Sequence, residues 1–375
     1  MTIFYICPWA EKPTGGIKQI FRHVEALNNA GFDAYVLALE ATMPSWFSSS
    51  AAVARVVTGR LSSFSRGLSR KKNKTAWISS MTAPVVEMNR FQEAVKKREL
   101  NSSDILVLPE YVGKALRPCG FGSKLMVFNQ NAHYTFNGFS HSDDSSEFIY
   151  KGHLLAALAV SEHTFDYLKF AFPDARVLLT PNGVDGGTFF PGSVRKKKQI
   201  AFMPRKLPGS IVQVLQILQG RGSLKGWDLC PIDGMAEAEV AEVLRQSAIF
   251  LSTCHDEGFG LPPLEAGASA CLVIGYTGYA AKEFMRPEYC YPIAQGDVLG
   301  FAKTLEQVIL EFNLSPTRLL QQAADYAEFL GNNYSKELEA KRVVAAWMEI
   351  VPPGDQRRCL PASAVRNLKA AAVST

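Results

Sequence analysis

The sequence lacks the features of exported and membrane-spanning proteins. Its seven cysteines are odd in number, lie far apart and include no C-x-x-C pair, so the pattern indicates neither a disulfide framework nor a zinc site. No apolar stretch approaches the roughly 20 residues that cross a bilayer, and the apolar run at residues 3–6 is too short for a signal peptide. We therefore expect a protein of the reducing cytoplasm.

Acidic residues are absent from one long segment of the chain. Residues 41–86 contain no Asp or Glu but carry seven Lys and Arg side chains, so the remainder has a net charge of −2 although the whole chain has +5. A nucleic-acid-binding protein more often spreads its basic residues over a docking face. We therefore expect no nucleic-acid partner and a local cause for this basic segment.

The basic segment has a helical pattern of apolar residues. Val53, Val57, Leu61, Phe64 and Leu68 recur at steps of three and four, which predicts an amphipathic helix. Two interpretations remain open for residues 53–74. The helix either docks on the anionic inner face of a membrane, where each basic residue contributes ~1 kcal/mol, or packs on a sheet and leaves a solvated basic tail.

The chain is long and apolar enough for two folded domains. It has 375 residues, of which 47% are hydrophobic and 20% charged. Short apolar runs alternate with helical patterns, which predicts an α/β fold with parallel sheets. Buried strands are expected at residues 3–7, 35–39, 105–108, 125–128, 155–160, 199–203, 249–253 and 272–274. No G-x-G-x-x-G follows a strand with an acid ~20 residues later, which argues against a nicotinamide dehydrogenase.

A dense turn signal at residues 181–187 indicates the domain boundary. We predict an N-terminal domain at residues 1–187 and a C-terminal domain at residues 188–350. The last residues, 351–375, are expected to form a tail that packs back on the N-terminal domain.

The segment from Ser252 to Ala266 carries the most chemical information. A strand ends, a loop with Gly258 and Gly260 turns, and a helix begins near two prolines. Ligands of open α/β sheets bind at the carboxyl ends of the strands, where glycines allow backbone N–H groups to approach an anion. Glu257 is expected in the loop and Glu265 in the first turn of the helix, where a carboxylate accepts hydrogen bonds from a ribose diol.

The two glutamates have the E-x7-E spacing, and with it the chain resembles the retaining glycosyltransferases of family 4. Further matches, in the family's order, are Gly15-Gly16, residues 159–162, residues 181–185 and Glu283. The resemblance implies the GT-B architecture of two facing Rossmann-like domains, with the acceptor on the N-terminal one and a nucleotide-sugar on the C-terminal one. It implies that Glu265 binds the ribose. It also implies that Glu257 and the backbone of residues 258–261, that is Gly258, Phe259, Gly260 and Leu261, bind the sugar and phosphates.

Cations and a histidine complete the site that the resemblance implies. Arg205 and Lys206 follow a strand and would neutralise the departing diphosphate. The family has a Lys about five residues after the Arg, where this chain has Ser210, so Lys206 is the candidate replacement. His133 would face the donor sugar, and the amides at Gly16 would meet the leaving phosphate. Solvated surface cations and a structural histidine are the alternative interpretations.

Lys18 has two interpretations, a contact with the leaving phosphate or a solvated lysine in a first helical turn. No Asp-x-Asp motif or histidine cluster with metal-ligand spacing is present, so we expect no catalytic metal and no cofactor.

These observations predict a retaining hexosyltransferase that acts on a surface polysaccharide or a lipid-linked glycan. A nucleotide-sugar epimerase and a non-catalytic nucleotide-sugar-binding module of the same fold are the alternatives. The base, the sugar and the acceptor are left open.

Overall fold

The computed structural model describes residues 1–7, 14–38, 46–56, 85–89, 96–99, 102–110, 124–144, 146, 148–152, 154–192, 195–205 and 207–351, with only the backbone described at 55–56, 85–89 and 96–99. The chain divides into two compact units, Met1–Pro181 with Ala340–Thr375, and Asn182–Glu339. The division lies six residues before the predicted boundary at 187/188. The chain returns to the first unit at residue 340, and the predicted tail beyond residue 351 lies outside the described residues.

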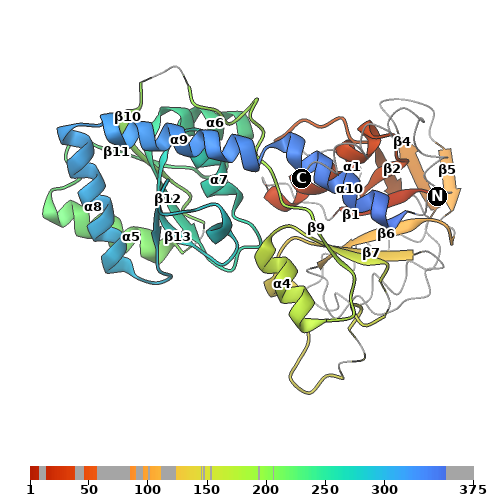
Figure 1. Cartoon of the computed structure of the whole chain (residues 1–375). Helices are drawn as coiled ribbons and strands as arrows, with labels where there is room; N and C mark the ends of the chain where they lie inside the picture. The colour runs from red at the N-terminus through yellow and green to blue at the C-terminus, as the bar shows by residue number, and fades with distance from the viewer. Residues whose placement is uncertain are drawn as a thin grey trace. The chain divides into compact units, whose positions relative to one another are not determined.

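The first unit contains a mixed sheet, which has nine strands within the described residues, in the order β5-β4-β3-β2-β1-β6-β7-β8-β9 (Figure 1). Its strands are β1 (Ile3–Cys7), β2 (Ala34–Ala38), β3 (Val53–Val56), β4 (Val85–Asn89), β5 (Lys96–Glu99), β6 (Ile105–Pro109), β7 (Lys124–Asn129), β8 (Ala156–Ala159) and β9 (Val177–Leu179). The strands from β3 to β9 in this order are parallel, as predicted. The edge strands β4 and β5 are antiparallel and were not predicted.

Residues 53–56, where the predicted amphipathic helix of the basic segment begins, form a strand and not a helix. Val53–Val56 pairs in parallel with β2, with Val53 opposite Val36 and Ala54 opposite Leu37. Ala54 is fully buried, because it lies in the apolar face of the sheet. Pairing with a buried strand therefore overrides the helical spacing here, and residues 57–74 lie outside the described part of the chain.

Side chains of the first sheet alternate between two apolar layers. The helix α4 (Glu162–Ala171) covers one face, where Leu168 packs with Phe4 and Leu106. On the other face, α1 (Gly15–Asn29) and the end of α10 (Lys336–Ile350) bring His23 and Trp347 against Tyr5. The helix α10 thus begins in the second unit and ends in the core of the first.

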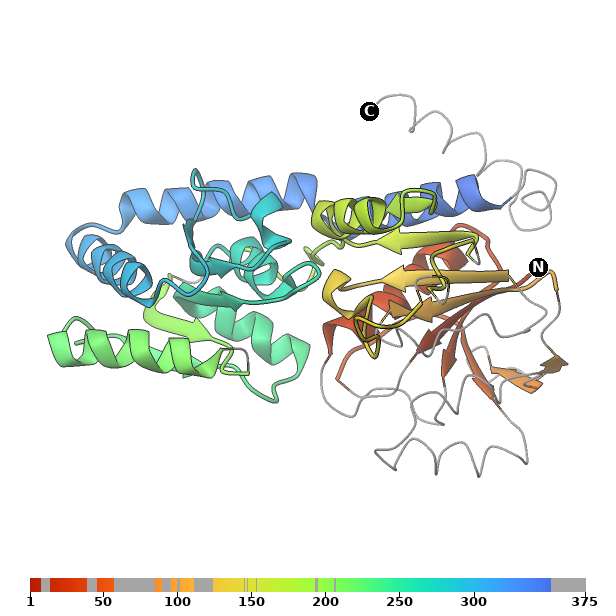
Figure 2. The ribbon, with the colours of Figure 1, turned by 90° about the horizontal axis from the view of Figure 1, so that it is seen from below.

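The second unit contains a parallel sheet of five strands within the described residues, in the order β11-β10-β12-β13-β14. Its strands are β10 (Lys197–Phe202), β11 (Asp228–Pro231), β12 (Ser247–Cys254), β13 (Leu272–Thr277) and β14 (Tyr291–Ile293). Its helices are α5 (Pro208–Arg221), α6 (Glu237–Gln246), α7 (Leu261–Ala268), α8 (Val298–Leu314) and α9 (Thr317–Asn333), and they lie on both faces of the sheet (Figure 2). Each unit is therefore a Rossmann-like α/β domain, as predicted.

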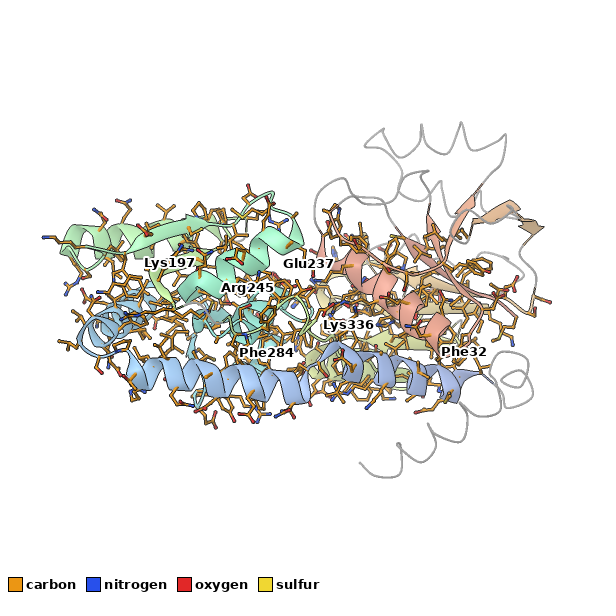
Figure 3. The ribbon with its side chains drawn as sticks, turned by 90° about the horizontal axis from the view of Figure 1, so that it is seen from above. Phe32, Lys197, Glu237, Arg245, Phe284 and Lys336 are labelled. Atoms are coloured by element: carbon orange, nitrogen blue, oxygen red, sulfur yellow. The ribbon has the colours of Figure 1, made fainter. Side chains whose placement is uncertain are left out.

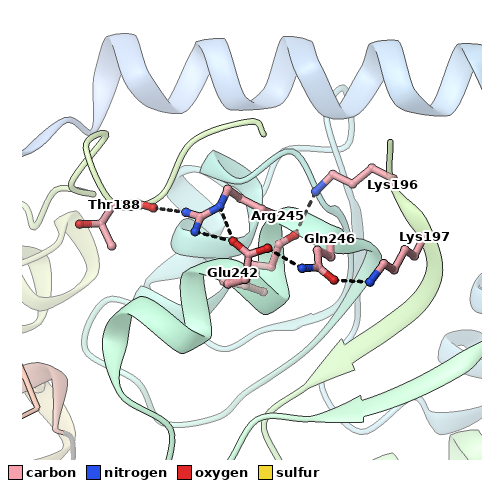
Figure 4. A network of polar contacts seen from close by, with 7 residues as sticks. Thr188, Lys196, Lys197, Glu242, Arg245 and Gln246 are labelled. Atoms are coloured by element: carbon pink, nitrogen blue, oxygen red, sulfur yellow. Dashed lines mark hydrogen bonds and ion pairs between the residues drawn. The ribbon is translucent and has the colours of Figure 1, made fainter. Parts of the chain in front are cut away.

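The segment that leads into β10 is attached to the end of α6 (Figures 3 and 4). Arg245 donates to the carbonyl of Thr188 at 2.9 Å and forms an ion pair with Glu242 at 2.8 Å. Lys196 Nζ donates to the carbonyl oxygens of Leu244 at 3.0 Å and Ser269 at 2.6 Å. A cation at the carboxyl end of a helix is stabilised by the unpaired carbonyl groups there, so this part of the basic run 195–198 has a structural role.

No helix within the described residues is both long enough and apolar enough to cross a membrane.

Candidate functional site

The predicted donor loop lies at the carboxyl end of the second sheet. Strand β12 ends at Cys254, opposite Thr277 of β13, and α7 begins at Leu261 after the loop 255–260. Gly260 has φ +96°, and a Cβ atom there would lie 3.1 Å from Ala281 Cβ and 3.3 Å from Cys254 Sγ. Only glycine fits this turn without strain, so the chain reverses tightly and directs the N-terminus of α7 to the loop.

Both glutamates of the E-x7-E segment are half-buried. Glu257 lies in the loop before α7 and Glu265 in the helix. Glu265 is the fifth residue of α7, so it lies at the start of the second turn and not in the first turn as predicted. A residue at this position lies too far from the helix N-terminus to act as a capping group.

Phe259 fixes the loop to the body of the second unit. Its ring is 3% exposed and packs against Phe284 and Tyr334, with centroid distances of 5.4 and 6.2 Å. The Tyr334 hydroxyl in turn donates to the carbonyl of Glu283, which ends the short helix η4 (Ala281–Glu283), at 3.3 Å. Phe259 can therefore serve a ligand only through its backbone, which is the role predicted for residues 258–261.

Arg205 lies in an exposed turn after β10. The strand ends at Phe202, so the alternation of strand side chains does not extend to Arg205. Its Nε atom lies 4.0 Å from Asp233 Oδ1, and both side chains are more than half exposed. Such an ion pair is weak and leaves Arg205 able to exchange Asp233 for a phosphate. Lys206 lies outside the described residues, and Ser210 is in the first turn of α5.

The residues predicted for the first unit lie at the carboxyl ends of its strands. Helix α1 begins at Gly15, so Gly16 is in its first turn and not in the loop before it. His133 is exposed in the short helix η2 (Ala132–Tyr134), which follows β7, and its ring stacks on His163 at 5.8 Å. Lys18 is only 8% exposed, which contradicts its interpretation as a solvated lysine.

Two residues that the sequence analysis missed connect these positions. Gln130 Nε2 donates to the carbonyl of Gly16 at 3.1 Å and so joins the end of β7 to the start of α1. Glu110 follows β6 directly and is 5% exposed. The sequence contained a signal for Glu110, because an acidic residue directly follows a buried parallel strand there. The same kind of position led to the prediction of Glu257 as a site residue.

The turn-rich motif at residues 181–185 has a structural role in the second unit. The backbone N–H of Gly183 donates to Glu339 Oε2 at 2.8 Å, and Val184 forms a parallel bridge with Ser335. A Cβ atom on Gly183 would lie 2.4 Å from the carbonyl oxygen of Ser335, so the close approach of the two segments requires glycine. Lys336, which is labelled in Figure 3, adds an ion pair with Asp185 at 3.1 Å.

No group of three or more His, Cys, Asp or Glu side chains among the described residues is arranged to bind a metal ion. The expectation of a reaction without metal stays a prediction.

Comparisons with known proteins agree with this architecture. Residues 232–325, which include the donor loop, match the family model for glycosyl transferases group 1. An alpha-1,6-glucosyltransferase from Actinobacillus pleuropneumoniae serotype 7 (strain AP76) is 28% identical over 294 residues, which are 69% of this chain and 82% of the relative.

Solved structures of low sequence identity share the fold. Sucrose-phosphate synthase from Thermosynechococcus elongatus aligns with a TM-score of 0.61 at 12% identity, over 93% of this chain and 99% of its own. HepE from Anabaena, in complex with UDP and glucose, aligns with a TM-score of 0.62 at 10% identity, over 93% and 100%. The chain therefore has the GT-B architecture with two Rossmann-like domains.

Proposed function

We propose that this protein is a retaining glycosyltransferase of family 4 that transfers a hexosyl unit from a nucleotide-sugar. The placement of Glu257 and Glu265 carries the proposal, since both lie at the carboxyl end of the second sheet, within the region that matches group 1 glycosyltransferases. The glucosyltransferase relative and the UDP in the HepE structure support UDP-glucose as the first donor to test.

The second unit binds the donor in this proposal. Glu265 accepts hydrogen bonds from the ribose, and the N-terminus of α7 with its preceding amides binds the diphosphate. Glu257 contacts the sugar. Arg205 leaves Asp233 and pairs with the phosphates, whose negative charge grows as the glycosidic bond breaks.

The first unit contributes the acceptor side together with His133 and Gly16. Retention follows when the acceptor hydroxyl attacks on the face from which the diphosphate departs and the leaving phosphate takes the proton. This step requires no protein nucleophile and no metal. The acceptor in the proposal is a hydroxyl of a surface polysaccharide or a lipid-linked glycan, at the cytoplasmic side of a membrane.

A thermal-shift screen of UDP-, GDP-, ADP- and dTDP-sugars tests the proposal. A donor present at 100 times its Kd is expected to stabilise the protein by ~2.7 kcal/mol, and Glu265→Ala is expected to remove most of that shift. Product analysis by NMR with and without an acceptor then separates the possible activities. An α-linked product supports the proposal, whereas an epimerised nucleotide-sugar, or donor binding without any turnover or hydrolysis, contradicts it.

A further inference from the structure

Glu110 is a buried acid beside the loop that carries His133. Strand β6 ends at Pro109, which lies opposite Phe128 of β7, so Glu110 lies beside the end of β7. Its side chain is 5% exposed, and its Oε2 atom has no hydrogen-bond partner among the described residues. Removing a carboxyl group from water in this way costs free energy unless hydrogen bonds or a paired charge compensate for the lost hydration.

The Glu110 carboxylate is bound by backbone N–H groups of the loop after β7. The N–H groups of Gln130 and Asn131 donate to it, in addition to its own. From there two connections lead outward. Asn131 Oδ1 accepts from the N–H of His133 at 3.1 Å, and Gln130 Nε2 donates to the carbonyl of Gly16 at 3.1 Å.

We propose that Glu110 is a positioning residue whose ionised carboxylate anchors the loop 130–133 and thereby holds His133 and Gly16 in place. The inference rests on the proposed function, since the positions of His133 and Gly16 matter if they act on a donor. Hydrogen bonds to a carboxylate are roughly twice as strong as those to a neutral group, so the loop tightens when Glu110 loses its proton.

The anchoring is expected to change near neutral pH. Burial raises the pKa of Glu110 to about 7, and the N–H groups of Glu110, Gln130 and Asn131 limit the rise. The loop is therefore anchored by the carboxylate above about pH 7 and released progressively as the pH falls through that value. The free energy of unfolding of the whole protein follows the opposite trend. Because the pKa of Glu110 is raised above the ordinary value of an unfolded glutamate, this free energy falls as the pH rises from ~4 to 7.

Other ionisable groups lie on the elements around Glu110. They are Tyr150 on the segment before β8, His133 in η2, His163 on α4 and Lys18 in α1. Burial raises the pKa of Tyr150 far above neutrality, so its hydroxyl does not titrate in this range. Imidazole groups change charge near neutral pH in general, so the test must separate them from Glu110.

Hydrogen exchange of peptides covering residues 129–135 tests the loop without any activity measurement. The proteins are the parent chain, Glu110→Gln as an uncharged isostere, and Asp166→Asn as a matched control on the exposed face of α4. At about pH 8 we expect the loop amides to exchange about tenfold more slowly in the parent and in Asp166→Asn than in Glu110→Gln. At about pH 6 all three are expected to agree within about twofold. Both imidazole groups are present in all three proteins, so their contribution cancels.

The proposal is overturned if the ratio of the amide exchange rates of Glu110→Gln and the parent is the same at both pH values. Such a result would mean that the substitution changes only the packing around residue 110. If Glu110→Gln does not fold, NMR on the parent decides. The amide shifts of Gln130 and Asn131 are expected to titrate with a midpoint near 7, and shifts that are constant across this range overturn the proposal.

Activity gives a separate readout of the consequence. The parent's kcat is expected to rise with a midpoint near pH 7 and that of Glu110→Gln to be flat and low. A protein without transferase activity refutes the proposed function while hydrogen exchange still decides the role of Glu110. Identical pH profiles in an active parent and an active Glu110→Gln refute the positioning role alone.

Discussion

The Tyr5 hydroxyl shares a hydrogen bond with Nδ1 of His23 at 3.2 Å, and Trp347 Nε1 donates to the same hydroxyl at 2.9 Å. Nε2 of His23, the other ring nitrogen, is buried and has no hydrogen-bond partner among the described residues. All three side chains are essentially unexposed. The chain of hydrogen bonds joins the first strand, the first helix and the end of α10 in one core.

This arrangement predicts that the first unit loses stability in acid. Burial lowers the pKa of His23 to about 3, whereas the imidazole of an unfolded chain has its ordinary value near 6.5. The unfolded chain thus binds one more proton between these values, and the contribution of His23 is complete above pH ~6.5 and declines as the pH falls toward 3.

Urea unfolding of the parent and His23→Phe at several pH values from about 7.5 to 4.5 measures this decline. The parent is expected to lose up to about 1.4 kcal/mol per pH unit more than the variant, the limit for one proton. If the free energy of unfolding changes with pH in the same way in both proteins, His23 binds its proton equally in the folded and unfolded states, and the prediction is wrong.

The donor loop yields a second prediction, which separates its two glutamates. Glu265→Ala removes a contact to the ribose that is present in both ground and transition states, so the KM for the donor should rise by about 10- to 100-fold with kcat little changed. Glu257→Ala should chiefly lower kcat. Glu328→Gln, on the exposed face of α9, is the matched control. Steady-state kinetics with an unchanged donor KM in Glu265→Ala would refute the ribose contact.

The donor loop and the central strands could be predicted from local pattern. The strand Ile3–Cys7 was predicted with its observed bounds, because a short apolar run before a turn and an amphipathic helix has few other interpretations. The loop and helix after β12 were predicted because glycines and prolines define such turns from their own residues.

Long-range contacts could not be predicted in this way. The helix expected from Val53 is a strand at its start because β2 pairs with it, and the pattern of the segment itself contains no information on β2. The return of the chain to the first unit depends on Trp347 meeting Tyr5, 342 positions away. Glu110 was missed although the rule for strand ends applied, because no motif surrounds it.

A third prediction concerns the basic segment, most of which lies outside the described residues. If it docks on a membrane, neutral replacement of Arg66, Arg70, Lys71, Lys72 and Lys74 should abolish binding to vesicles that contain anionic lipid, because each cation contributes ~1 kcal/mol at the surface. Activity on a soluble acceptor should be unaffected. Co-sedimentation at physiological salt measures the binding, and equal binding by variant and parent would leave the segment without a docking role.

A fourth prediction is that transfer needs no divalent metal. Arg205 and the N-terminus of α7 are expected to neutralise the diphosphate in its place. Initial rates after treatment with EDTA should equal those with added Mg²⁺ or Mn²⁺. A rate that falls at least tenfold on chelation and recovers with metal would show that these groups are insufficient.

The last prediction concerns Arg205 and its exposed partner Asp233. If Arg205 binds the leaving diphosphate, Arg205→Ala leaves the growing charge unpaired, and kcat should fall by about 10² to 10³, roughly 3 to 4 kcal/mol. Asp233→Asn should leave kcat at or above the parent value, because the ion pair at 4.0 Å holds Arg205 away from the phosphates only weakly.

The same series decides whether Lys206 supplies the cation that the family places near Ser210. Lys206→Ala should reduce kcat less than Arg205→Ala, because the proposed membership of family 4 assigns the diphosphate contact to Arg205 and only a substitute role to Lys206. A normal kcat in Arg205→Ala would refute the diphosphate contact. A normal kcat in Lys206→Ala, with Arg205→Ala impaired, would assign the second positive charge to another side chain, and the buried Lys18 is then the next to replace.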